Sequence, residues 1–121
     1  MGLSLRTNRL RTAIKLLLLT KCDQVFYRKA KGTEGTHVVF LLDEFRADET
    51  VNEISLEVRV IGRGGNTEGA EDLSDDIWEL LDHYYYTADD IQFTTYQNTR
   101  AVVEEDDSVI YRRLVFEVRA L

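Results

Sequence analysis

The stretch VNEISLEVRVIGRGGNTEGAEDLSDDIWELL, residues 51–81, joins two hydrophobic patterns of different period. Within 51–61, polar and apolar side chains alternate from Glu53 to Val60, which is typical of a β-strand with one buried face. After the glycine-rich segment 62–67, apolar residues recur every three or four positions, as on the buried side of a helix. This helical stripe comprises Ala70, Leu73, Ile77, Leu80, Leu81 and Tyr84. The stretch therefore predicts a strand, a loop and a helix on one core.

The flanking segments add further elements on both sides. A first helix over about residues 4–20 is predicted because the spacing of five residues puts them on one face of an amphipathic helix: Leu3, Leu10, Ile14, Leu17 and Lys21. Runs of β-branched and aromatic residues predict strands at 24–30, 36–45, 91–103 and 108–121, with the acidic turn EEDD at 104–107. The predicted order is α-β-β-β-α-β-β. This order indicates a single α+β domain over 1–121, an antiparallel or mixed β-sheet covered on one face by two α-helices.

The predicted core joins the strands at 51–61 and 108–121 to both helices. A chain of 121 residues with 44% apolar residues and no proline is long enough to bury such a core. The strand side is expected to consist of Ile54, Leu56, Val58, Val60, Leu114, Phe116 and Val118. The helix side is expected to consist of Leu10, Ile14, Leu17, Leu73, Ile77 and Leu80.

The segment before the first predicted strand bears on the cellular compartment. Its longest apolar run, Leu16 to Leu19, is far shorter than the roughly 20 residues of a membrane span. Basic residues precede this run, but no small-residue cleavage site follows, so we expect no secretory signal. Cys22 is the single cysteine and has no partner for an intrachain disulfide. A reducing cytosol is therefore the expected compartment.

The net charge of −7 is unevenly distributed along the chain. Residues 1–22 contain five basic residues and no acidic one, whereas residues 64–99 contain nine acidic residues and no Lys or Arg. A general nucleic-acid-binding domain is usually basic over a whole face, so this pattern argues against that class. It indicates instead two surfaces of opposite charge.

The glycine-rich segment GRGGNT at 62–67 lies between a strand and a helix, where nucleotide-binding proteins hold phosphate. It has neither the Lys-Ser/Thr pair of a Walker loop nor the GxGxxG spacing of a Rossmann loop. Moreover, Glu68, Glu71 and Asp72 would repel an anion at the start of the helix. We interpret the segment as a connector, not as a phosphate site.

Other patterns that might carry chemistry are weak. Asp75, Glu79 and His83 recur at helical spacing, but no second His or Cys cluster completes a metal shell, which favours a solvated acidic face. The EEDD turn lacks the ligand spacing of an EF-hand. Neither His37, expected to open a strand, nor His83 lies beside a nucleophile motif. We therefore predict no catalytic residue, no metal site and no cofactor, and not an enzyme.

Several large apolar residues are predicted to face away from the core. Trp78 lies about 100° from the centre of the second helix's stripe, and Tyr85 follows one heptad later on the same flank. Leu5, Leu16 and Leu19 lie on the side of the first helix opposite its core residues. Such residues often mark a protein interface, but a helix that ends early or a covering loop would account for them equally well. In the tyrosine run at 84–86, Tyr84 is expected in the core and the other two over the sheet edge.

Three segments together resemble a known family. The tail terminator proteins of long-tailed bacteriophages, also called tail completion or minor tail proteins, have segments similar to HVVFLLDEF (37–45), AEDLSDDIWELLDHY (70–84) and IYRRLVFEVRAL (110–121). The closest matches are the last segment and LSDDIWELLD (73–82) within the second. The resemblance implies a homo-oligomeric ring, a hexamer, that caps the tail tube and offers the surface to which the head connector docks. It implies no catalytic residue and no cofactor.

The same resemblance implies a location and partners. The protein would lie at the tail-neck junction of the virion, after assembly in the host cytoplasm, in contact with the tail tube protein and the head connector. DNA would pass through the ring without sequence-specific binding, and no membrane would be involved. The alternatives are a head-completion or stopper protein of the neck, and a small cytosolic protein-binding module.

The charge pattern predicts how ring subunits would meet. A closed ring uses two different patches per subunit, and opposite charges favour that pairing. We expect Arg9, Arg11 and Lys15 of one subunit near Asp75, Glu79 or Asp82 of its neighbour. The apolar contact area is expected from Leu16, Leu19, Trp78 and Tyr85. The competing prediction is that both charge sets meet within one subunit.

Overall fold

The strand predicted from alternation, β3 (Asn52–Gly62), lies near the middle of a six-stranded sheet. The computed structural model describes residues 6–32, 35–47, 51–62, 67–106 and 109–121. The other elements are α1 (Thr7–Leu19), β1 (Val25–Tyr27), β2 (His37–Ala47), α2 (Thr67–Leu80), β4 (Tyr85–Ala88), β5 (Ile91–Asp106) and β6 (Val109–Ala120). Across the sheet the strands are ordered β1-β2-β3-β6-β5-β4. The predicted α+β class is confirmed.

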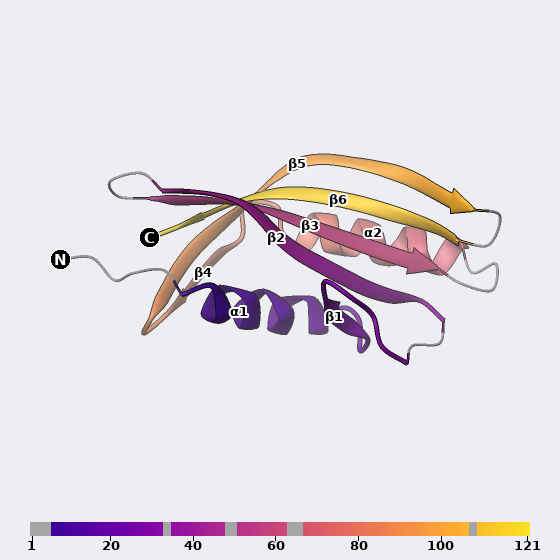
Figure 1. Ribbon diagram of the computed structural model, residues 1–121, viewed down its shortest axis with the longest axis horizontal. Coiled ribbons are helices and arrows are strands. Elements are labelled where there is room, and N and C mark those ends of the chain that lie inside the picture. Colours follow the sequence, from indigo (N-terminus) through magenta and orange to yellow (C-terminus); the bar gives the residue numbers. More distant parts are fainter. Residues whose placement is uncertain (1–5, 33–34, 48–50, 63–66, 107–108) are drawn as a thin grey trace.

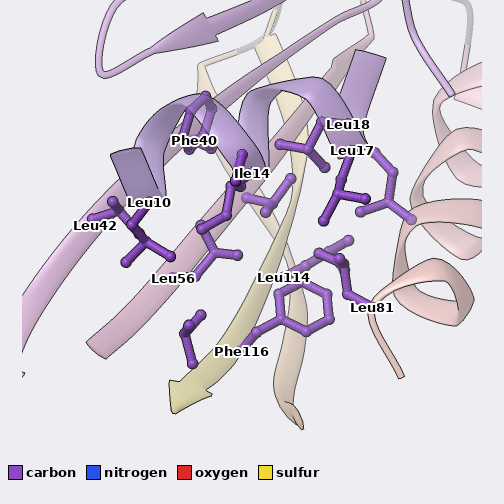
Figure 2. Packing of buried hydrophobic residues seen from close by; sticks show 14 of the residues in the cluster. Leu10, Ile14, Leu17, Leu18, Phe40, Leu42, Leu56, Leu81, Leu114 and Phe116 are labelled. Atoms are coloured by element: carbon purple, nitrogen blue, oxygen red, sulfur yellow. The ribbon is translucent and has the colours of Figure 1, made fainter. Parts of the chain in front are cut away.

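Both helices lie on the same face of a strongly twisted sheet (Figure 1). Side chains from α1, α2, β3 and β6 meet in one buried cluster, in which Leu10, Ile77, Leu56 and Phe116 are almost inaccessible to water. Figure 2 shows Leu10, Leu17 and Leu18 of α1 directed toward the apolar side chains of the strands. Burial of this shared apolar surface is the main force that holds the helices on the sheet.

The predicted core residues belong to this cluster with two exceptions. Leu73 and Leu80 lie at its margin and are only partly buried. Leu18, which the helical pattern did not assign to the core, is fully buried beside Leu17. The buried side of α1 is therefore wider than predicted.

The first two strands pair in parallel, while all other strand pairs are antiparallel. A parallel pair cannot be joined by a tight hairpin turn and needs a return crossing of the chain. This return begins at Arg28, whose φ of 67° lies in the left-handed region, and Gly32 and Gly35 also have positive φ. The sheet is consequently mixed.

The tyrosine run at 84–86 departs from the predicted order. Helix α2 ends at Leu80, and His83 adopts a φ of 52° that is incompatible with a continuing helix. Tyr85 and Tyr86 then enter β4, which pairs with β5 at the sheet edge. The observed order is α-β-β-β-α-β-β-β. Tyr85 was predicted to share the flank of Trp78 on one helix, and this prediction is wrong because the helix has already ended.

Two polar side chains of β5 fix the end of α2. The hydroxyl of Thr95, fully buried, donates a hydrogen bond of 2.8 Å to the carbonyl oxygen of Leu81. The side-chain amide of Gln97 donates one of 2.9 Å to the carbonyl oxygen of Trp78. Carbonyl groups at a helix end have no partner within the helix, so these bonds satisfy them and tie α2 to the sheet.

Candidate subunit interface

The outer side of α1 forms an open groove with β1. Leu16 and Leu19 expose 57% and 39% of their surface, and they line the groove together with Arg11, Lys15, Thr12 and Tyr27. The predicted exposure of these two leucines is confirmed, whereas Leu5 lies outside the described residues. The groove combines an apolar wall with two basic side chains.

Tyr27 gives the groove a fixed aromatic wall. The guanidinium carbons of Arg11 and Arg28 each lie 5.2 Å from the centre of its ring, a distance typical of cation–π contacts. The centres of its ring and of the Phe40 ring lie 5.1 Å apart, in an edge-to-face arrangement. Arg28 is held in turn by a 3.2 Å hydrogen bond to the carbonyl oxygen of Leu42. The groove is therefore built on a packed aromatic pair.

The outer side of α2 is acidic throughout the described helix. Its exposed residues are Glu68, Asp72, Asp75, Asp76 and Glu79. Apart from the adjacent pair Asp75 and Asp76, they follow one another at intervals of three or four, so they share one broad side of the helix. Of these acids, Glu68 lies in the first turn of the helix, where negative charge stabilises the positive end of its dipole. The solvated acidic face predicted from the sequence is confirmed.

Trp78 does not project away from the core as its position on the helix predicted. The centre of its ring lies 5.2 Å from the centre of the Phe116 ring, and the guanidinium carbon of Arg100 lies 5.3 Å from the centre of the Trp78 ring. Arg100 also forms an ion pair of 3.3 Å with Asp75. Trp78 is thus half-buried between the core and an arginine of its own subunit. Its contacts described here therefore lie within its own subunit.

Tyr85 lies far from this group. It is 58% exposed, and it pairs across the ladder with Thr94, which in turn pairs with Arg119 of β6. Directly opposed residues in antiparallel strands point to the same face, and this face is the one opposite the helices. The structure therefore does not bring Tyr85 together with Trp78.

Several charged residues predicted to meet a neighbouring subunit have partners within their own. Arg9 forms a two-fold hydrogen-bonded ion pair with Asp90 in the turn between β4 and β5. The hydrogen bond from Arg9 lowers the pKa of Asp90 below its usual value. Asp75 pairs with Arg100, and Asp82 lies 2.6 Å from Nδ1 of His83.

The two helices, however, do not pair with each other. Among the described residues, no ion pair joins α1 to α2. Arg11 and Lys15 form no ion pair within the same part of the chain, and neither does Glu79. The predicted basic and acidic patches thus both keep unpaired charge on their outer sides.

The face of the sheet opposite the helices carries an ion-pair network that was not predicted from the sequence. Glu57 of β3 accepts hydrogen bonds from Arg59 and from Arg113 of β6. Burial, the largest single influence, acts to raise the pKa of Glu57, but the hydrogen bonds from Arg113 and Arg59 lower it below its usual value. Charges spaced two residues apart on neighbouring strands were the signal for this network.

The histidines occupy structural positions. His37 opens β2 as predicted, is buried, and its Nδ1 lies 3.1 Å from the carbonyl oxygen of Gly35. His83 lies beyond the end of α2, so the helical spacing of Asp75, Glu79 and His83 does not exist. No group of three His, Cys, Asp or Glu residues in the described segments is arranged to hold a metal ion. Most of the glycine-rich segment, residues 63–66, lies outside the described residues.

Neither helix, over the residues that the structure describes, is long and apolar enough to cross a membrane.

Comparison with known proteins gives a likeness of fold. No family model matches the sequence, and no curated protein matches it. A chain from the virion of a native gene transfer agent particle superposes with a TM-score of 0.64 at 14% identity, over 93% of this chain and 90% of that one. A second solved chain, whose name states no function, superposes with a TM-score of 0.59 at 12% identity, over 95% and 96%. Nearly the whole fold is therefore shared with a virion component.

Proposed function

We propose that this chain is a non-enzymatic structural protein of a bacteriophage, prophage or phage-like particle, and that it acts as a tail terminator. The fold shared with a chain of a gene transfer agent virion carries this proposal. The resemblance of residues 37–45, 73–82 and 110–121 to tail terminators favours this role over other virion parts. In this role a ring, a hexamer, caps the tail tube and ends its growth.

The surfaces of the subunit are suited to such a ring. A basic and apolar groove on α1 and an acidic side on α2 are two different patches of opposite charge on one chain. Heterologous contacts between unlike patches are the kind that close into rings. The ring would meet the tail tube protein on one side and the head connector on the other, at the tail-neck junction. DNA would pass through it without sequence-specific contacts.

The test is removal of the gene from the particle-producing host, followed by electron microscopy of the particles. Loss of a terminator leaves tail tubes of uncontrolled length and filled heads without tails. Expression of the intact chain from a plasmid should restore tails of uniform length. Antibody labelling of complemented particles should mark the junction of head and tail.

Two other outcomes would replace the proposal. Tails of normal length beside heads that fail to join them would identify a head-completion or stopper protein of the neck. Normal infectious particles would contradict both virion roles and favour a small cytosolic binding module.

A further inference from the structure

We infer that the groove on α1 receives the acidic outer side of α2 from a second copy of the same chain. This inference deepens the proposed function, since it names the contact from which the ring would be built. It rests on three observations: the chemistry of the groove, the unpaired charges of α2, and the different positions of α1 and α2 over the sheet.

The groove is built for an acidic helix. Arg11 and Lys15 lie one helical turn apart on its rim, and Leu16 and Leu19 provide the exposed apolar wall. Lys15 forms no ion pair within the described segments. A partner with carboxylates one turn apart and adjoining apolar side chains would satisfy both parts of this surface.

The outer side of α2 has this composition. Asp72, Asp76 and Glu79 are exposed at intervals of four and three residues, and no basic residue of the described chain pairs with them. Leu73 and Leu80, only partly buried, border this acidic side. The spacing of the carboxylates thus matches the one-turn spacing of Arg11 and Lys15.

One subunit does not close this contact on itself. Helix α1 packs against β1, at one edge of the sheet, whereas α2 packs against β3 and β6 in its middle. The groove lies on the β1 side of α1, because Tyr27 of β1 forms its wall. A second copy is therefore required, and the contact is heterologous, so each subunit still offers one free patch to the next.

The experiment uses two charge-reversed forms of the whole chain. Groove form A carries Arg11→Glu with Lys15→Glu, and helix form B carries Asp76→Lys with Glu79→Lys. Native mass spectrometry and sedimentation at low salt should show oligomers of the wild type and a loss of oligomers for A alone and for B alone. Reversal of two exposed charge pairs weakens each contact about tenfold.

Mixing A with B is the decisive step. The acidic groove of A then meets the basic helix of B, and the basic groove of B meets the acidic helix of A. Oligomers should return, with the two forms in equal number and an even total. The control is Lys29→Glu with Lys31→Glu, which makes the same charge change on exposed residues outside the groove and should leave the oligomers intact.

A covalent test covers the case in which a charge-reversed form fails to fold. In a Cys22→Ser background, Leu16→Cys chains mixed with Glu79→Cys chains should form mixed disulfide dimers under mild oxidation. Cross-linking of Leu16→Cys chains mainly to each other would mean a symmetric contact and would overturn the inference. The inference would also be overturned if the wild type stays monomeric and the two cysteine variants give no mixed cross-link, or if a mixture of A and B does not reassociate.

The experiments distinguish failure of this contact from failure of the proposed function. If gene removal gives overlong tails but mixing A with B restores nothing, the terminator role stands and this contact is wrong. If mixing restores oligomers while particles lacking the gene are normal, the contact stands and the role is wrong. If form A self-associates normally but no longer complements the deletion, the groove binds the tube protein and not a second copy of this chain.

Discussion

The two faces of the sheet are made by neighbouring residues of the same strands and are stabilised in different ways. On β3, Leu56 and Val58 point to the helices and are fully buried. Glu57 between them points to the face opposite the helices, called the open face below, and accepts hydrogen bonds from two arginines. The helix side depends on apolar burial, which needs no particular partner. The open side depends on ion pairs, which respond to pH and salt.

The two faces should therefore respond differently to substitution. Substitutions on the helix side should be costly whatever the pH, and those on the open side should be mild and pH-dependent. Substitutions on the outer sides of the helices should affect assembly and not folding.

The largest effect is expected at Phe116 of β6. Its side chain is fully buried and touches the ring of Trp78, so Phe116→Ala should lower the free energy of unfolding by about 3–5 kcal/mol. The α2 side of the same cluster should respond similarly, with a loss of about 2–5 kcal/mol for Ile77→Ala. Urea denaturation followed by circular dichroism measures both.

Residues of one type on the two faces of β6 provide the control. Val118 is fully buried under the helices, whereas Val115 lies partly exposed on the open face. Val118→Ala should be clearly more destabilising than Val115→Ala. Equal losses would mean that the two faces are not energetically distinct.

A middle effect is expected at Thr95, a polar residue on the apolar face. Thr95→Val keeps the shape but leaves the buried carbonyl oxygen of Leu81 without its donor, which should cost about 1–3 kcal/mol. Amide exchange near the end of α2 should speed up. The matched change Thr94→Val, one residue away on the open face, should have little effect on either measurement.

A smaller, pH-dependent effect is expected at Glu57. Glu57→Gln weakens the bonds to Arg59 and Arg113 and should cost about 1 kcal/mol at neutral pH. Because the folded-state pKa of Glu57 lies below the ordinary value of 4.5, its contribution is present above that pH. This contribution is lost as the pH falls through the folded pKa.

Unfolding curves at a series of pH values between neutral and acidic conditions test this sign. The wild type and Glu57→Gln should converge in stability at low pH. A difference that persists unchanged into acid would mean that the charge of Glu57 is not the source of the effect. Glu53→Gln is the control, since Glu53 lies 4.0 Å from its nearest arginine, Arg119.

The smallest effect on stability is expected at Lys15. Its side chain is exposed and unpaired in the described structure, so Lys15→Glu should change the free energy of unfolding by less than about 0.5 kcal/mol. Thermal unfolding at a concentration too low for self-association measures this change. A large loss would show that Lys15 supports the fold of the subunit.

Much of the fold follows from hydrophobic period alone. The alternation in β3 and β6 and the helical stripe of α2 each identified the buried face, because one apolar core selects the same side of every element. The prediction for Tyr85 was wrong because Tyr84, just before it, continues the helical stripe. The left-handed conformation of His83, which ends the helix, has no clear signal in the local sequence. The parallel pairing of β1 with β2 likewise depends on the return path of the chain.

The candidate site could be predicted only in part. Exposure of Leu16 and Leu19 follows from their position on α1, which is a local property. Arg9 and Asp90 lie 81 residues apart in sequence, and their pairing is fixed by where α1 and the β4–β5 turn come to lie. Charge patterns indicate which surfaces attract, but not which partner lies nearest after folding.

The central place of β6 has a consequence for biosynthesis. This strand lies between β3 and β5, yet it is the last of the described strands to leave the ribosome. Until then, β1 to β3 and β4 to β5 form two separate groups, each with an open edge and an apolar face. Such unfinished sheets are prone to mispairing between nascent chains. We therefore expect the yield of native protein to depend on synthesis rate and on chaperones that shield the growing chain.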